Sequence, residues 1–308
     1  MDDTINVTYL TLTGFTELHK YRYLCFIIMF KLYVLIICFN VTIVVLIGIH
    51  KNLHEPMYIF IAALLINSLL YSTNIYPKML TDILSAKQII TYPLCLLQSF
   101  IYYTMMGSEF LLLAAMSYDR YVSICKPLQY PTIMRKSTVS VILVLSWILP
   151  ACELAVLVVL YANNKVCSYT LTGIFCNNSI YSIQCVRSVA ISVYGVFMFV
   201  NIILFPLIFI LYTYTRILII SYRSCKTVRK KAAQTCLPHL LVLINFSCFA
   251  TYDIIIVRLE LDLAKLLRLI MTLQIIVYHP LFNPIIYGLK MKEISKHLKR
   301  MWNQLKSH

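Results

Sequence analysis

Charged side chains inside or just beyond a long apolar stretch are the residues of this chain best suited to chemistry. Residues 95–115 are almost uncharged, and the pair Asp119-Arg120 follows soon after them. Glu109 lies within the stretch, ten residues before Asp119. A carboxylate inside a bilayer costs several kcal/mol unless it is neutral or paired, so we expect Glu109 to face the protein interior and a polar partner. Taken alone, the Asp119-Arg120 pair indicates the aqueous boundary of a membrane helix.

Four of the eleven cysteines fall where they could form disulfides. Cys95 begins one apolar run, and Cys167, Cys176 and Cys185 follow at intervals of nine residues in a later, more polar segment. Disulfides at these positions imply an oxidising exterior. Four cysteines allow three pairings, and the sequence alone does not choose among them. The other seven lie in or beside apolar runs, where we expect them to pack as small hydrophobic residues.

Asparagine sequons mark candidate glycosylation sites. Asn6-Val7-Thr8 lies in the N-terminal segment, which makes Asn6 the better candidate, and residues 177–179 form a second sequon. The same pattern occurs at 40–42 and 245–247, inside apolar runs that no glycosylating enzyme reaches. The pattern is therefore weak evidence by itself.

The composition predicts a membrane protein that crosses the bilayer several times. The 308 residues are 60% hydrophobic and 13% charged, and the mean hydropathy is +0.80, which is too apolar for a soluble globular surface. The net charge of +15 does not indicate nucleic-acid binding, because the basic residues cluster between apolar runs and form no groove interleaved with aromatic residues.

Seven apolar runs are each near or above the twenty or so residues that a helix needs to cross a bilayer. They are 24–49, 57–80, 95–119, 138–160, 189–221, 232–257 and 266–288. With the N-terminus outside, seventeen of the 27 basic residues fall on the inner side, which supports that orientation and an inner C-terminus. The first residues lack a basic signal-peptide region, so we expect the first run to act as an uncleaved signal-anchor.

Five motifs, in order along the chain, resemble those of the odorant receptors, a rhodopsin-like branch of the G-protein-coupled receptors, with the fish type as a candidate branch. Residues 116–130, MSYDRYVSICKPLQY, are similar to the inner end of that family's third helix. The other four motifs lie at 53–58, 77–80, 231–240 and 280–287. The resemblance implies an all-α membrane protein: a seven-transmembrane-helix rhodopsin-like bundle with a short amphipathic C-terminal helix.

We expect one receptor domain over 1–308, with an extracellular segment 1–23, a bundle 24–288 and a cytoplasmic tail 289–308. In the tail, Met291, Ile294, Leu298, Met301 and Trp302 recur at steps of three and four residues among basic residues. This pattern is typical of a helix on an anionic membrane surface, and a disordered basic tail is the alternative.

The resemblance implies a receptor at the plasma membrane that binds small odorant molecules and activates a heterotrimeric G protein of the stimulatory, cyclic-AMP-raising type. A non-olfactory rhodopsin-like receptor for a peptide or small metabolite is the alternative. Repeat symmetry and paired broken helices, which indicate transporters, are not evident. We expect no enzymatic activity, cofactor or metal, because the chain has no HExxH, GxSxG, GxGxxG or phosphate-loop motif and its histidines show no ligand spacing.

The resemblance also implies roles for particular residues. It pairs Cys95 with Cys176 and Cys167 with Cys185. Ser68, Glu109 and Asn283 would form an intramembrane polar site, in which Ser68 replaces the usual Asp, so that we doubt that sodium binds and leave Glu109 as a lone acid. The residues implied in activation and G-protein coupling are Asp119, Arg120, Tyr121, Tyr214, Asn283, Pro284 and Tyr287. In the sixth helix Ser247 stands where the family has an aromatic residue, with Phe246 or Phe249 as substitutes.

The ligand is expected in the outer half of the bundle, between the third, fifth and sixth helices. As lining we nominate, by position, Tyr102, Tyr103, Met106, Met198, Ile202, Ala250, Thr251 and Ile254, although each alone is as well explained by packing. Arg258 could pair with the carboxylate of an acidic ligand. A surface ion pair with Glu260, Asp262 or Asp253 is the alternative.

Overall fold

The computed structural model describes residues 8–14, 21–185, 188–222, 236–237, 239–248, 251 and 265–306. Within these residues, six stretches of helix are long and apolar enough to cross a membrane. They are α1 (Arg22–Ile49), α2 (Pro56–Leu84), α3 (Tyr92–Cys125), α5 (Lys136–Ala162), the continuous stretch of α6 (Val189–Met198), η5 (Phe199–Leu204) and α7 (Phe205–Tyr222), and α9 (Lys265–Lys290).

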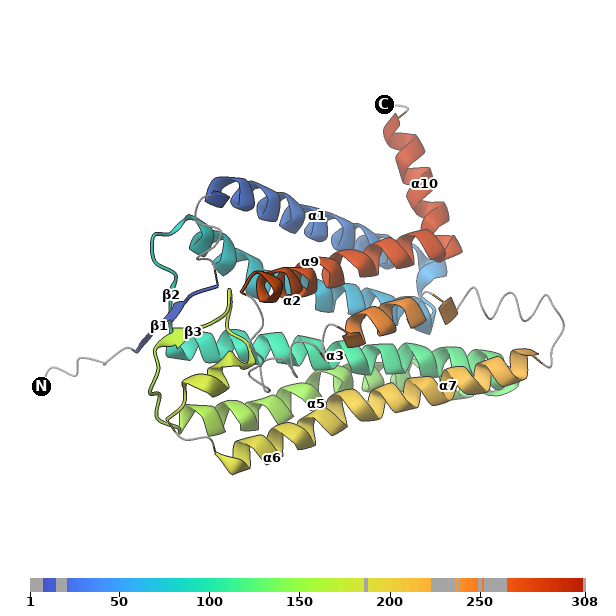
Figure 1. Ribbon diagram of the computed structural model, residues 1–308. Helices are drawn as coiled ribbons and strands as arrows, with labels where there is room; N and C mark the ends of the chain where they lie inside the picture. Colours follow the sequence, from blue (N-terminus) through green and yellow to red (C-terminus); the bar gives the residue numbers. More distant parts are fainter. Residues whose placement is uncertain are drawn as a thin grey trace, which may run out of the picture.

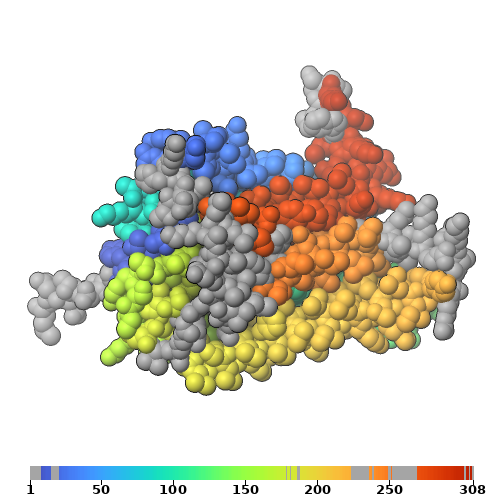
Figure 2. Space-filling view, in the orientation of Figure 1, coloured from blue at the N-terminus to red at the C-terminus, as the bar shows by residue number. Residues whose placement is uncertain are grey.

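The predicted sixth span, 232–257, is described only in part. His239–Cys248 is a shorter apolar helix, and the space-filling view shows this segment, in orange, between α7 and α9 (Figure 2). The remainder of that span lies outside the described residues, apart from 236–237 and 251. The six long helices and this segment have the order expected of a seven-helix rhodopsin-like bundle.

The third span extends further than predicted. The predicted end was residue 119, whereas α3 continues to Cys125. No helix-breaking residue follows Asp119 until Pro127. The Asp119-Arg120 pair therefore lies in the last two turns of a helix, and its side chains are held by a regular backbone.

A small sheet closes one end of the bundle (Figure 1). Strand β1 (Tyr9–Leu12) lies between β2 (Ile89–Thr91), antiparallel to it, and β3 (Thr170–Leu171), parallel to it. Leu10 and Leu12 point to one face of β1 and are buried, as the alternation of a strand requires. We call this end of the bundle the sheet end.

The opposite end, which we call the tail end, carries the helix α10 (Lys292–Lys306) (Figure 1). Ile294 is fully buried, whereas Met301 is exposed. The side-chain amide of Asn52 lies 3.2 Å from Nε2 of His297. The predicted amphipathic helix thus exists, and its first turns pack on the bundle.

Candidate functional site

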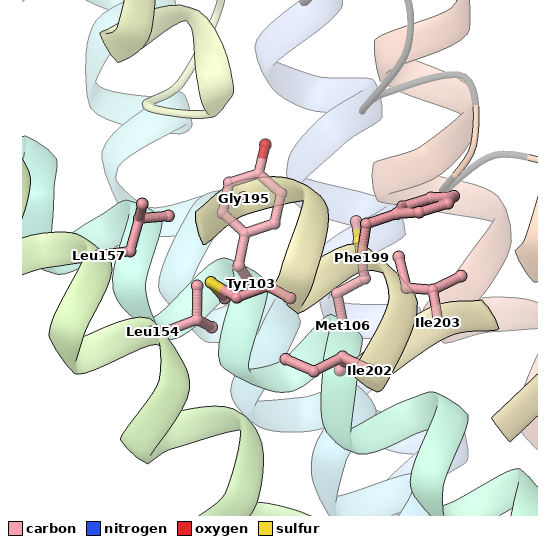
Figure 3. A pocket seen from close by; sticks show the side chains of 10 residues that line it. Tyr103, Met106, Leu154, Leu157, Gly195, Phe199, Ile202 and Ile203 are labelled. Carbon is pink, nitrogen blue, oxygen red and sulfur yellow. The ribbon is translucent and has the colours of Figure 1, made fainter. Parts of the chain in front are cut away.

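A cavity of about 90 Å³ opens between α3, α5, α6 and η5. Side chains from these helices converge on it (Figure 3). Its lining consists of Tyr103, Met106, Gly107, Leu154, Leu157, Gly195, Met198, Phe199, Ile202 and Ile203. Tyr103 alone among them carries a side-chain oxygen. The cavity is smaller than the roughly 300–1,000 Å³ of drug-sized sites, so it suits a small and mostly apolar molecule.

Two local features shape this cavity. A Cβ atom at Gly107 would lie 2.7 Å from Cγ2 of Ile202 and 2.9 Å from Cβ of Pro150, so only glycine allows α3 to approach so closely. On the other wall, the backbone of η5 is π-helical. A π-helical turn within an α-helix is rare and is frequent at functional sites.

The structure separates the nominated ligand residues. Tyr103, Met106, Met198 and Ile202 line the cavity. Tyr102 does not: it is fully buried and its ring lies 4.9 Å from that of Phe175 and 5.3 Å from that of Tyr71. Successive residues of a helix point about 100° apart, so Tyr102 packs toward α2 and the loop while Tyr103 faces the cavity.

Most of the ligand-binding residues nominated on the sixth span lie outside the described residues. Thr251 is half-buried and is not among the lining residues, and Ala250, Ile254 and Arg258 lie outside the described residues. Asn6 does as well. The role of Arg258 in binding an acidic ligand therefore stays a prediction.

Sequence reasoning missed the contribution of α5, which supplies Leu154 and Leu157. It also missed Gly107, Gly195, Phe199 and Ile203. Helical spacing could have found three of these, because Gly107 lies four residues after Tyr103, Gly195 lies three before Met198, and Phe199 lies three before Ile202.

Glu109 lies on α3 at the centre of a buried polar network. Its Oε2 accepts a hydrogen bond from Nδ2 of Asn67 at 3.1 Å, and its Oε1 accepts one from Nδ2 of Asn283 at 2.9 Å. Nδ2 of Asn283 also donates to Oγ of Ser68 at 3.2 Å. The three predicted members, Ser68, Glu109 and Asn283, thus come together.

Glu109 also has a basic neighbour that the sequence analysis did not identify. Nε2 of His279 lies 2.8 Å from Oε1 of Glu109, without the alignment of a hydrogen bond. Nε1 of Trp147 donates to Oδ1 of Asn67 at 3.1 Å. His279 stands four residues before Asn283, so helical spacing already placed both on one face of α9.

At the tail end, Asp119 is fully buried and accepts hydrogen bonds from two sides. Nε of Arg120 donates to Oδ2 at 3.0 Å, and the hydroxyl of Tyr130, in α4 (Tyr130–Ile133), donates to Oδ1 at 2.8 Å. Burial, followed by the negative charge of Asp119, raises the pKa of the Tyr130 phenol above its usual range. Tyr130 therefore keeps its proton and remains a donor at physiological pH.

The other residues implied in coupling lie on α3, α7 and α9. Tyr214 and Tyr287 are buried, and the hydroxyl of Tyr287 lies 3.3 Å from Nδ1 of His239. Tyr121 is half-buried beneath Nζ of Lys126, 5.9 Å from its ring centroid. Pro284 lies within α9.

Phe246 is one of the two aromatic residues that could substitute for the aromatic residue missing at Ser247. It is buried, and its ring lies 4.9 Å from that of Phe110 and 4.5 Å from that of His279. An aromatic side chain of the sixth span thus contacts both α3 and α9. Phe249 lies outside the described residues.

Two disulfides fasten the long loop between α5 and α6 at the sheet end. Cys95 is bonded to Cys176 and Cys167 to Cys185, the pairs that the family resemblance implies. The loop is also hydrogen-bonded to α3: the backbone N–H of Cys176 donates to Oε1 of Gln98 at 3.0 Å, and Oγ of Ser99 donates to the carbonyl of Cys176 at 3.0 Å.

Comparison with known proteins gives one family. A family model described as "Olfactory receptor" matches residues 28–305. Human Olfactory receptor 11A1 is 32% identical over 298 residues, which cover 96% of this chain and 94% of that protein. Human Olfactory receptor 2A5 is 35% identical over 284 residues, 89% of each chain. Human Olfactory receptor 2T2 is 31% identical over 302 residues, 96% of this chain and 92% of its own.

Proposed function

Since the chain belongs to the olfactory receptor family, and with it to the G-protein-coupled receptors of the plasma membrane, we propose that it binds small odorants in the cavity between α3, α5 and η5 and raises cyclic AMP through a stimulatory G protein. The family is a class of receptors and not of enzymes. The observation that carries the proposed site is the cavity itself, which is lined almost wholly by apolar side chains.

The lining favours particular ligands. Methionine, leucine and isoleucine side chains offer dispersion contacts and no charge, and Tyr103 supplies one hydroxyl. We expect neutral volatile molecules with an apolar body and at most one or two polar atoms to bind best. An acidic ligand would need Arg258 in addition.

We further propose that the sheet end is extracellular and the tail end cytoplasmic. The excess of basic residues on the tail side supports this orientation. Both disulfides lie at the sheet end, and disulfides persist in an oxidising exterior. Asp119, Arg120 and α10 would then face the G protein.

A tryptophan introduced into the cavity should reduce odorant potency. Leu154 is 4% exposed and lines the cavity, so the indole of Leu154→Trp would occupy much of the space. We expect the odorant concentration that gives half-maximal cyclic AMP to rise at least about tenfold, the equivalent of about 1.4 kcal/mol.

Ile148→Trp is the matched control, because Ile148 lies on the same helix but is 50% exposed and lines neither this cavity nor the one beside α7. Its potency should equal that of the wild type at equal surface expression. Equal potency of the Leu154→Trp variant would place the odorant elsewhere. A fall of cyclic AMP on stimulation would instead indicate an inhibitory G protein.

A further inference from the structure

Side-chain amides of two neighbouring helices contact the carboxyl group of Glu109. Trp147 carries only a donor, so the atom of Asn67 that faces it at 3.1 Å is the amide oxygen. The amide nitrogen of Asn67 is thereby directed at Oε2 of Glu109. A nitrogen of Asn283 faces the other oxygen, Oε1.

Both carboxylate oxygens of Glu109 thus accept hydrogen bonds from donors. Oε1 also faces Nε2 of His279 at 2.8 Å. The carboxyl group of Glu109 is thus surrounded by three nitrogen atoms, although its side chain is fully buried.

A buried carboxyl group needs a polar partner. Within the described part of the chain, His279 is the ionisable group that pairs with Glu109. His279 is 3% exposed, and aromatic rings surround it: its ring centroid lies 4.5 Å from that of Phe246 and 5.4 Å from that of Tyr71. Neither ring nitrogen of His279 makes an aligned hydrogen bond within the described residues, so its polar contact is the close approach to Glu109.

The same contacts make the site unsuitable for a free cation such as sodium. Hard cations are bound by oxygen atoms. Here the groups nearest the carboxylate are two amide nitrogens and an imidazole nitrogen. Ser68 supplies a hydroxyl, but that oxygen accepts a hydrogen bond from Asn283 and its proton is donated to the carbonyl of Leu64 at 3.1 Å.

We infer that His279 is the internal partner of Glu109 and takes the place that a sodium ion would occupy. The pair joins α3 to α9 across the middle of the bundle, and Phe246 brings the sixth span against the same imidazole ring. The network would then be insensitive to sodium and would depend on both members of the pair. This inference concerns the unliganded receptor and goes beyond the proposed odorant function.

A double-mutant cycle on the purified full-length receptor tests the inference without any odorant. Thermal unfolding would be followed for the wild type, His279→Gln, Glu109→Gln and the double variant, each in sodium chloride and in choline chloride. His279→Gln removes the partner of the buried carboxyl group, so its melting temperature in choline should fall by about 5–10 °C. The double variant removes both members of the pair and should recover most of that loss.

Sodium supplies the second readout. The melting temperature of the wild type should be the same in the two salts, because amide nitrogens already occupy both oxygens of Glu109. His297→Gln is the matched control, since His297 is also buried but lies in α10. Its effect should simply add to that of Glu109→Gln.

Three results would overturn the inference: a His279→Gln variant within about 2 °C of the wild type, additive losses in the double variant, or stabilisation of the wild type by sodium. If His279→Gln does not fold, the yield of the double variant His279→Gln/Glu109→Gln tests the inference. A yield equal to that of the wild type supports the pairing of His279 with Glu109, and a double variant that also fails to fold contradicts it.

Discussion

A receptor without the Cys95–Cys176 disulfide is expected to lose most of its folded population at the cell surface. The bond closes a loop with a sequence separation of 81 residues. In the chain-entropy model, opening such a loop costs about 4.5 kcal/mol of stability, out of the roughly 5–15 kcal/mol typical of a folded protein. The loop would also lose its anchor beside Gln98 and Ser99 of α3.

The double variant Cys95→Ser/Cys176→Ser tests this expectation without leaving an unpaired thiol. Surface receptor would be counted with an antibody to an N-terminal tag, and thermal unfolding measured on purified protein. Cys167→Ser/Cys185→Ser is the matched control, because its loop spans only 18 residues and should cost about 3 kcal/mol. A smaller loss for the first pair than for the second would contradict the prediction.

The second large effect is expected at Asp119. Asp119→Asn keeps the shape of the side chain but removes the charge that holds Arg120 and Tyr130. Hydrogen bonds to charged groups contribute about 1.5–3 kcal/mol. If the ion pair restrains the resting receptor, its loss should shift the balance between resting and active forms roughly tenfold or more. Cyclic AMP without odorant should therefore rise several-fold.

Arg120→Ala should abolish signalling instead of raising it, because Arg120, once released from Asp119, is the side chain expected to contact the G protein. That variant should give no odorant response at normal surface expression. Tyr130→Phe removes only one hydrogen bond to Asp119 and should raise the baseline less than Asp119→Asn does. An unchanged baseline in Asp119→Asn would show that this pair does not hold the resting state.

Much of the architecture followed from the sequence because the bilayer restricts what an apolar run can do. Six predicted spans correspond to long helices of the described residues, since only a helix satisfies its own backbone in lipid. The amphipathic tail helix followed from its three- and four-residue steps. The small sheet was not predicted. Its strands have two to four residues and come from three distant segments, so no local sequence pattern predicts that they pair.

The candidate site was predicted less completely, for a geometric reason. Tyr102 and Tyr103 are neighbours of the same type, and only the rotation of α3 in the bundle decides which of them faces the cavity. The wall formed by Leu154 and Leu157 depends on how α5 packs, which the sequence does not encode locally. The partnership of Glu109 with His279 joins residues 170 positions apart, and neither residue alone identifies the other.

The central claim is that odorants occupy the cavity between α3, α5 and η5, and direct binding to the purified receptor tests it without the G protein. The most potent odorant from a cellular screen would be titrated against the wild type, Gly107→Ala and Gly48→Ala. A methyl group at Gly107 collides with Ile202 and Pro150 at the cavity wall, whereas one at Gly48 has nothing within 4 Å. We predict that Gly107→Ala raises Kd at least about tenfold while Gly48→Ala leaves it unchanged. Equal affinity of all three proteins would contradict the proposed binding site.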